Sequence, residues 1–469
     1  LVFSSMRPKE RKSHEQQKKG NTTLLRGEYI YFYTALTSDQ FSPIAKAAAV
    51  SYFRRFFTKH TEPPEYFDSK LMDSLLSIVK DPSILVDIRT ESAWALTNLL
   101  CSKETPLTHS ILQKGALETF VDGIVNGVAK FRDQCVWAVA NVAADCDKCK
   151  RKVRNTNALD EIAKMMHHGD FNTCEGLKSA IWCCLNIMRG GQGMFTIEYS
   201  TASHLIAGIN EGMAKYPSDF TLLRDSLHLL TLVADDRYFG IPPLNAPSII
   251  DLILMEEGLV ERTTTCLRMA NESLVSPSLR LLGNIITGTD EQTQEIISIE
   301  GFIDDLIRCL NGNSLQWSRE AAWILSNIAA GPSEHVDILT TNCRLLSLLL
   351  KLIHSEDSRL AREVSWIIIN LLSSYNVHDR TRDLEEMLGY GVLRVVEFVS
   401  SERAEGRLLD KSLQVFSFIL SRYPEWRKPM EKWSEGGSAS NPVYRSLHPS
   451  PPSRPLPIHI SFLNPSQPL

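Results

Sequence analysis

The 469-residue chain lacks the features that mark membrane proteins, secreted proteins and the common enzyme classes. It has no run of about eighteen apolar residues and no signal peptide, so we expect neither a membrane span nor secretion. It also has no phosphate-binding glycine loop, no Gly-x-Ser-x-Gly elbow and no His-Glu-x-x-His motif, so we expect no catalytic site and no cofactor. The net charge is only −5, which gives no bulk attraction to nucleic acid.

Strand patterns and paired cysteines are missing as well. No stretch of any length alternates apolar and polar residues, which favours an all-α fold. The ten cysteines are scattered, as in a reduced intracellular protein. Cys146 and Cys149 have the spacing of half a zinc site, but no second pair of cysteine or histidine follows at usable spacing. We therefore expect free thiols and no metal.

A tryptophan followed four residues later by an asparagine recurs along the chain. The pairs are Trp94/Asn98, Trp137/Asn141, Trp182/Asn186, Trp323/Asn327 and Trp366/Asn370. Positions i and i+4 lie on one face of a helix, so each pair presents an indole beside a carboxamide. An indole is a flat wall for an aliphatic stem or a cation, and a carboxamide can donate to and accept from a peptide backbone.

The pairs return about every 43 residues, which is the period of armadillo or HEAT arrays. The long gap after Trp182 has room for two more units, which centre on His228/Leu232 and Arg280/Asn284. Residues 235–250 contain three prolines and are expected to form a loop that interrupts the first of these units. The pattern predicts a right-handed, all-α superhelical solenoid of about nine armadillo repeats, with the pairs along one concave groove.

Glycines at equivalent places support the repeat. Each follows one short apolar stretch and precedes another, and the four are Gly115, Gly258, Gly301 and Gly391. A glycine at such a turn fits a left-handed cap between two short helices.

Two polar segments flank the predicted repeat domain of residues 39–433. Residues 1–38 are basic at first and are expected to be a solvated tail. The chain begins with Leu1 rather than methionine, so we expect it to be truncated at its start. Residues 434–469 are rich in proline, serine and glycine and are expected to be disordered. Within them, residues 449–455 have the look of a polyproline ligand for an SH3-type domain, but the composition favours a tail with no partner.

Four segments resemble importin alpha, the armadillo adaptor that carries nuclear localisation signals. They are residues 91–98, 134–145, 283–294 and 320–323. The third is the most specific, because its polar loop has no evident packing reason to take that form. The family also places an arginine where Arg280 replaces tryptophan. The resemblance implies recognition of a basic peptide in extended form, in the cytoplasm and the nucleus.

The resemblance also implies the site residues. Indoles would hold lysine and arginine stems, asparagines would pair with the peptide backbone, and acidic residues would bind the charged heads. The main pocket would comprise Trp94, Asn98, Gln134, Trp137, Asn141, Asp145, Trp182, Asn186 and Asp225. A second, smaller pocket would comprise Arg280, Asn284, Asp290, Glu320, Trp323, Asn327, Glu363, Trp366 and Asn370. Arg189 matches the residue that separates the two pockets.

The sequence departs from the family at several of these positions. Ser179 stands where asparagine is usual, His228 where tryptophan is usual, and Leu232 where tyrosine is usual. Residues 101–103 replace small residues, and Leu107 stands where a threonine is expected. The first pocket is therefore expected to bind more weakly or to prefer different sequences.

The resemblance implies three kinds of protein partner. Cargo proteins with basic nuclear localisation signals are the first. Residues 11–21 resemble the end of the family's importin-beta-binding segment, and we weigh importin beta binding equally against a basic tail with no specific role. The family has ten repeats, so a count of about nine argues against the exportin contact made by the last one.

One alternative reading is an armadillo scaffold for signalling or adhesion, in the manner of beta-catenin. Such a scaffold usually presents a basic groove to acidic partners. The residues expected to accompany the tryptophans here are acidic, which favours basic partners.

Overall fold

The computed structural model describes residues 18–60, 63–64, 67–100, 105–191, 195–238, 243–269, 271–374 and 406–422. The chain divides into two compact units, Leu1–Gly288 and Thr289–Leu469. Each unit is treated by itself below. The expectations for residues 1–17, for Gly391 and for the tail at 434–469 lie outside the described residues.

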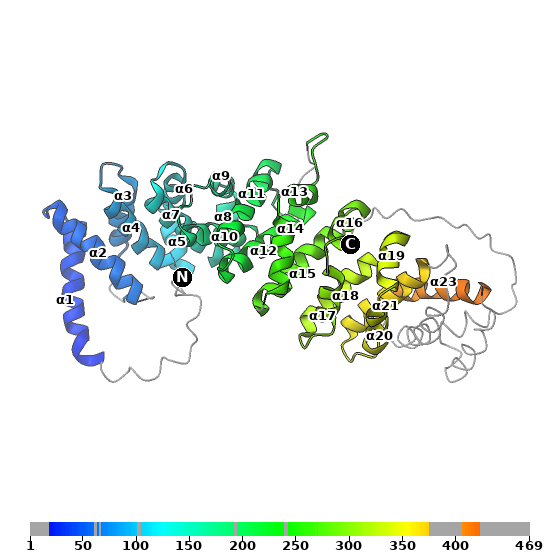
Figure 1. Cartoon of the computed structure of the whole chain (residues 1–469). Helices are drawn as coiled ribbons and strands as arrows, with labels where there is room; N and C mark the ends of the chain where they lie inside the picture. The colour runs from blue at the N-terminus through cyan, green and yellow to red at the C-terminus, as the bar shows by residue number, and fades with distance from the viewer. Residues whose placement is uncertain are drawn as a thin grey trace, which may run out of the picture. The chain divides into compact units, whose positions relative to one another are not determined.

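The first unit is helical throughout its described residues (Figure 1). Its helices are α1 (Lys18–Thr37), α2 (Pro43–Lys59), α3 (Ser69–Lys80), α4 (Val86–Leu100), α5 (Thr105–Gln113), α6 (Ala116–Asn126), α7 (Ala129–Asp145), α8 (Asp147–Arg154), α9 (Ala158–His167), α10 (Cys174–Met188), α11 (Tyr199–Lys215), α12 (Phe220–Val233), the short 3-10 helix η2 (Asp236–Tyr238), α13 (Ile249–Met255), α14 (Leu259–Arg268) and α15 (Glu272–Ile286).

The second unit is also helical in the part that the structure describes. Its helices are α16 (Asp290–Ile297), α17 (Phe302–Leu310), α18 (Leu315–Ile328), α19 (Ser333–Thr340), α20 (Cys343–Leu352), α21 (Ser358–Ser374) and α23 (Gly406–Arg422). Neither unit contains a β-strand within the described ranges, and the Ile197 amide donates to the Tyr238 carbonyl at 2.8 Å. No helix of the described residues combines the length and hydropathy needed to cross a membrane. The prediction of an all-α array is confirmed.

One helix of each repeat carries the Trp/Asn pair or its substitute, and we call these the ladder helices. In the first unit they are α4, α7, α10, α12 and α15, and each packs against the next. In the second unit α18 packs against α21 in the same way. Small residues such as Ala93, Ala138 and Ala140 are fully buried on these helices. Buried alanines allow close approach between helix backbones, which leaves the larger side chains on the remaining faces.

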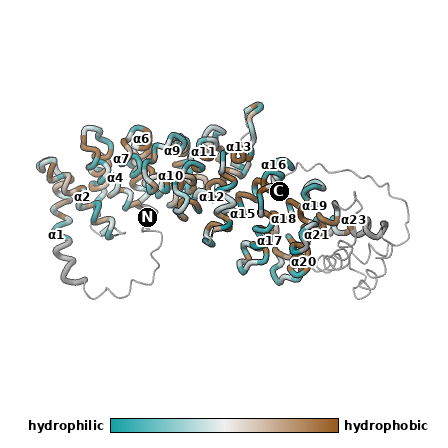
Figure 2. Tube along the Cα trace, viewed as in Figure 1, coloured by the Kyte–Doolittle hydropathy of each residue, from teal (hydrophilic) through white to brown (hydrophobic). Residues whose placement is uncertain are grey.

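Hydrophobic residues face neighbouring helices in both units. Figure 2 shows hydrophobic and hydrophilic segments alternating along the helices, as the 3.6-residue period requires. Phe120, Phe131 and Phe302 are among the largest fully buried side chains. Each repeat therefore buries its apolar face on an adjacent repeat, as expected for an array in which no unit is stable alone.

The predicted glycine caps are confirmed where the structure describes them. Gly115, Gly258 and Gly301 have φ angles of 80°, 73° and 74°, and each precedes the first residue of a helix. Positive φ is strained for residues with a Cβ, so glycine is favoured at these turns. The irregular segment predicted from residue 235 is also confirmed in its described part, since only η2 interrupts it before α13.

The expectation of a solvated tail is wrong for residues 18–37, which form α1. Tyr29, Tyr33 and Leu36 recur at helical spacing, and Tyr29 and Leu36 are buried. The Tyr29 ring meets Phe53 of α2 edge to face, with ring centroids 5.2 Å apart. The Tyr33 hydroxyl donates to Asp68 at 2.6 Å. An aromatic stripe thus docks α1 onto α2 and α3, although basic residues precede it in the sequence.

Candidate functional site

All five tryptophans of the pairs are partly exposed, whereas the residues beside them in sequence are buried. Around Trp94, for example, Ala93 and Ala95 are fully buried. The ring centroids of Trp94 and Trp137 lie 6.4 Å apart, with their planes tilted by 53°. The indoles of α4 and α7 therefore share one accessible apolar surface and are not part of the core.

The asparagines connect each ladder helix to the preceding one. In four of them the carboxamide donates to a backbone carbonyl of the preceding ladder helix. The accepting residue comes directly before the residue that stands at the asparagine's position in that helix. These bonds run from Asn141 to Thr97 (3.4 Å), from Asn186 to Ala140 (3.4 Å), from Asn284 to Thr231 (3.2 Å) and from Asn370 to Ser326 (3.0 Å). Asn98 makes the corresponding bond to Arg54 at 3.4 Å, whereas Asn327 bonds to Trp323 in its own helix.

These bonds give the asparagines a structural role that the sequence pattern does not reveal. Each bridge takes one N–H of a group that has two N–H donors and an accepting oxygen. It also fixes the plane of the carboxamide beside the indole on the same helix. We call the row formed by Trp94, Asn98, Trp137, Asn141, Trp182 and Asn186 the Trp/Asn strip.

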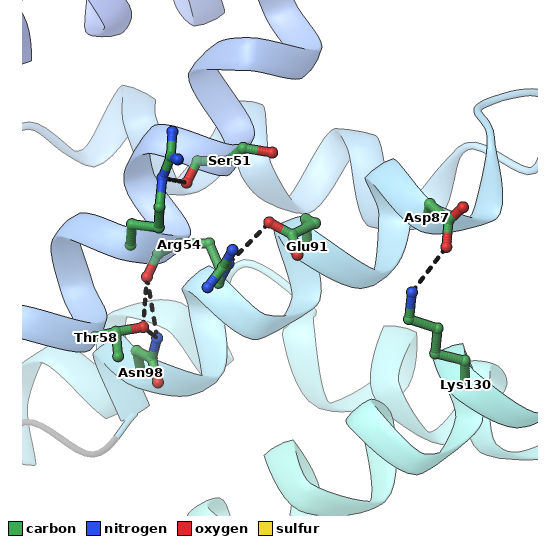
Figure 3. A network of polar contacts seen from close by, with 8 residues as sticks. Ser51, Arg54, Thr58, Asp87, Glu91, Asn98 and Lys130 are labelled. Carbon is green, nitrogen blue, oxygen red and sulfur yellow. Dashed lines mark hydrogen bonds and ion pairs between the residues drawn. The ribbon is translucent and has the colours of Figure 1, made fainter.

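A guanidinium group of the chain itself lies on the strip. The Cζ atom of Arg54, on α2, is 4.8 Å from the ring centroid of Trp94. Its Nε donates to Glu91 at 2.8 Å, and Figure 3 shows Arg54 lying between Glu91 and Asn98. Asn98 also donates to Thr58 at 3.0 Å. Sequence reasoning did not identify Arg54. The available signal was Glu91, an acidic residue three positions before Trp94 that could pair with a cation over the indole.

The remaining residues predicted for the main pocket have partners in the first unit. Gln134 is buried and donates to Thr97 at 2.9 Å, so it serves the contact between α4 and α7. Asp225 forms an ion pair with the adjacent Arg224 at 2.9 Å. Neither contact involves an indole of the strip.

Asp145 is the last residue of α7 and lies in a cluster of polar side chains. Thr108 donates to its Oδ1 at 3.2 Å, and the Cys149 thiol donates to its Oδ2 at 3.5 Å. The family resemblance predicts a threonine at position 107, which is Leu107 in this chain. In the structure the next residue, Thr108, places its hydroxyl beside Asp145. Burial, together with Cys146 and Asp145, raises the pKa of Cys149.

The same cluster holds a set of metal-ligating groups. His109, Asp145, Cys146 and Cys149 bring one ligand atom each within 4.8 Å of one another. The two cysteines are free thiols, as the sequence indicates. The search of the sequence missed His109 because it precedes the cysteines and comes from another helix.

The middle of the first unit is more basic. His228 is partly buried in α12 in place of a tryptophan. Burial and the nearby guanidinium groups of Arg189, Arg224 and Arg280 lower the pKa of His228, against the effect of Asp225. Arg280 is exposed, so positive charge replaces the indole at this part of the array.

The residues predicted for the second pocket are divided between the two units. Arg280 and Asn284 belong to the first unit, and Asp290, although exposed at the start of α16, belongs to the second. The others lie on α18 and α21, where Ser326 donates to Glu363 at 3.4 Å and Asn370 donates to the Ser326 carbonyl. Glu320 is partly exposed on α18, and the side-chain amide of Gln316 donates to its carboxylate at 3.3 Å. The structure thus brings together the α18 and α21 members, including the partly exposed Trp323 and Trp366.

Comparison with known proteins relates the chain to importin alpha subunits. Importin subunit alpha-1b of Oryza sativa subsp. japonica is 27% identical over 253 residues, which is 53% of this chain and 43% of the relative. Importin subunit alpha-2 of Caenorhabditis elegans is 24% identical over 308 residues, or 65% of this chain and 53% of the relative. The chain spans about half the length of the curated relatives it matches.

Two further comparisons concern the fold. No family model matches the chain. A solved structure of an engineered protein superposes with a TM-score of 0.58 at 16% identity, covering 90% of this chain and 97% of that one. At this identity the likeness bears on the all-α repeat fold alone.

Proposed function

We propose that this chain, a divergent relative of the importin alpha family, is a non-catalytic adaptor that binds a basic peptide in extended form along the Trp/Asn strip. The proposal extends to cargo proteins that carry basic nuclear localisation signals, and to their transport from the cytoplasm into the nucleus. Trp323, Asn327, Trp366 and Asn370 would bind a second basic segment in the same manner.

The placement of Arg54 is the observation that carries the proposal. Its guanidinium lies over the Trp94 ring and pairs with Glu91, so the strip already holds a basic side chain between an indole and an acid. A lysine or arginine from another chain would meet an indole at Trp137, and a second basic side chain of the same peptide would meet the carboxylate of Asp145, about 12 Å further along α7. Cation–π contact and charge-assisted hydrogen bonding both favour such a side chain.

The spacing of the strip also suits an extended peptide. Alternate residues of an extended chain lie about 6.4 to 6.8 Å apart and point to the same side. The Trp94 and Trp137 ring centroids are 6.4 Å apart, so alternate side chains of one peptide would meet successive indoles. The carboxamides of Asn98 and Asn141 would then lie beside the peptide backbone, which needs hydrogen-bond partners when it is held straight.

Peptide binding tests the proposal directly. A fluorescent lysine-rich import-signal peptide is titrated with the reduced, chelator-treated protein at several salt concentrations, and anisotropy gives the Kd. We expect binding that weakens as salt rises, because salt screens the charge pairs. The control peptide has glutamine at each lysine. Equal affinity for both peptides would overturn the proposal, and a preference for an acidic peptide would favour the signalling or adhesion scaffold instead.

Removing the internal competitor should strengthen peptide binding. Arg54→Gln vacates Trp94 and Glu91 and removes a positive charge from the strip. An exposed cation–π contact and a surface ion pair together contribute about 1 to 2 kcal/mol, so affinity should rise by roughly 5- to 30-fold. The same anisotropy titration measures the change.

The adjacent arginine provides a matched control. Arg55 is exposed and donates to the Ser51 carbonyl of its own helix at 3.2 Å. Arg55→Gln removes the same charge one residue away and should leave peptide affinity unchanged. If both variants gain equally, the effect is general electrostatics and Arg54 is not a competitor.

Importin beta is proposed as a second partner through the basic segment of residues 11–21. A pull-down of importin beta with the full chain tests this step separately from peptide binding. Absence of binding would restrict the function to the cargo side. The exportin contact is not part of the proposal.

A further inference from the structure

Four side chains with different metal-binding groups meet where α7 ends and α8 begins. His109 comes from α5, Asp145 is the last residue of α7, and Cys146 and Cys149 lie at the N-cap and in the first turn of α8. Cys146 Sγ is 3.5 Å from His109 Nε2, and Cys149 Sγ is 3.5 Å from Asp145 Oδ2. All four ligand atoms lie within 4.8 Å of one another.

These distances agree with the edges of a small coordination tetrahedron. Zn–S bonds of about 2.3 Å and Zn–N or Zn–O bonds of about 2.0 to 2.1 Å place tetrahedral ligand atoms about 3.3 to 3.8 Å apart. Two of the observed separations already fall in that range. The other separations are at most 4.8 Å, and His109, Asp145 and Cys146 are only partly buried, which leaves their side chains room to rotate toward a shared ion.

The local backbone already holds one of the two sulfurs in place. The Cys149 amide donates to Cys146 Sγ at 3.4 Å, so this sulfur caps the N-terminus of α8. This contact fixes the position of Cys146 Sγ at the start of α8. Cys149 is fully buried, which keeps one ligand out of bulk water while the other three remain accessible to an entering ion.

We propose that His109, Asp145, Cys146 and Cys149 form a four-ligand site for Zn²⁺. Thiolate and imidazole ligands select zinc over magnesium and calcium, which prefer all-oxygen sites. Binding would release the two thiol protons to solvent. The resulting centre has two thiolates, one carboxylate, one neutral imidazole and the divalent ion, so it carries a net charge of about −1. The proposed site includes all four metal-ligating side chains of the cluster.

Cobalt provides a direct test, because tetrahedral Co²⁺ bound to thiolates has visible ligand-field bands and a near-ultraviolet charge-transfer band. The full chain is reduced with a phosphine, freed of metal and titrated with Co²⁺. We expect both sets of bands to saturate at one equivalent and to disappear when one equivalent of Zn²⁺ is added. Reduced protein that gives no such bands would overturn the proposal, as would a Cys146–Cys149 disulfide that forms in preference to metal binding.

Variants identify the ligands. Cys149→Ser should abolish the charge-transfer band, and His109→Ala, at a partly exposed position, covers the case in which the buried substitution impairs folding. Cys174→Ser is the matched control, since Cys174 is also partly exposed and donates to a carboxylate, that of Asp219, at 3.4 Å. It should leave the spectrum unchanged. Bands that survive both His109→Ala and a folded Cys149→Ser would place the metal elsewhere and overturn the assignment.

The site has a consequence for the strip, and this part depends on the proposed function. A metal bound to Asp145 withdraws the carboxylate proposed to bind a lysine, so zinc loading should weaken peptide binding to a similar extent as neutralising Asp145. The cobalt spectrum is recorded without peptide, so metal binding and peptide binding fail or succeed independently. If the zinc-loaded and metal-free proteins bind the peptide equally, the coupling is refuted and the metal site stands on its spectrum.

Discussion

Replacing Asp145 by lysine is expected to weaken binding of a lysine-rich peptide by on the order of 100-fold. The carboxylate lies at the end of α7, one helical turn beyond Asn141, and is partly exposed. Loss of a hydrogen bond to a charged group costs about 1.5 to 3 kcal/mol, and the introduced ammonium group adds repulsion. Anisotropy titrations with metal-free protein measure the loss.

Asp147→Lys is the matched control for this charge reversal. Asp147 is exposed, lies two residues away in the first turn of α8, and gives the same change in net charge. It should change peptide affinity much less than Asp145→Lys does. Equal losses in the two variants would mean that long-range charge, and not a pocket at Asp145, governs binding. Circular dichroism melts establish that both variants are folded.

Much of the fold was predictable because local rules and the repeat agree. The period of the Trp/Asn pairs located the ladder helices, and three glycines marked turns that have positive φ in the structure. Helix α1 was missed because its aromatic stripe follows a basic stretch, and composition was weighed above spacing. Its docking depends on Phe53, a contact between separate helices that local sequence does not specify.

Less of the candidate site was predictable, because its contacts join residues about 37 to 53 positions apart. Spacing of i and i+4 indicated that each indole lies beside a carboxamide. It did not indicate that the carboxamides also bridge consecutive repeats, nor that Arg54 covers Trp94. His109 and Thr108 reach the Asp145 cluster only because α5 lies next to α7. The helical period therefore identifies which residues form the Trp/Asn strip. The side chains that contact each of these residues depend on how separate helices pack, which the period does not specify.

Arg154→Met is expected to destabilise the first unit by about 2 to 4 kcal/mol. Arg154 on α8 closes the C-terminus of α10, where it donates to the carbonyls of Ile187 (2.7 Å), Met188 (3.2 Å) and Arg189 (3.1 Å). The last carbonyls of a helix have no partner within it, and Arg154 donates to three of them at once. Methionine retains an apolar stem but donates no hydrogen bond. Tyr238 (2.7 Å) and the Gly191 amide (3.0 Å) would still donate to Met188, and Lys150 would still donate to Arg189 at 3.2 Å, whereas Ile187 would lose its Arg154 donor.

Hydrogen exchange of the α10 amides is the appropriate measurement, because repeat arrays need not unfold in one step. The loss should be largest near the C-terminal end of α10, the helix that carries Trp182 and Asn186, so the third indole of the strip would become mobile together with its support. Arg151→Met is the control, since Arg151 is exposed on the same helix and should change the free energy of opening by less than about 0.5 kcal/mol. Similar protection in the two variants would show that the α10 terminus is held by Tyr238 and the packing of α7 against α10, and that the guanidinium contributes little.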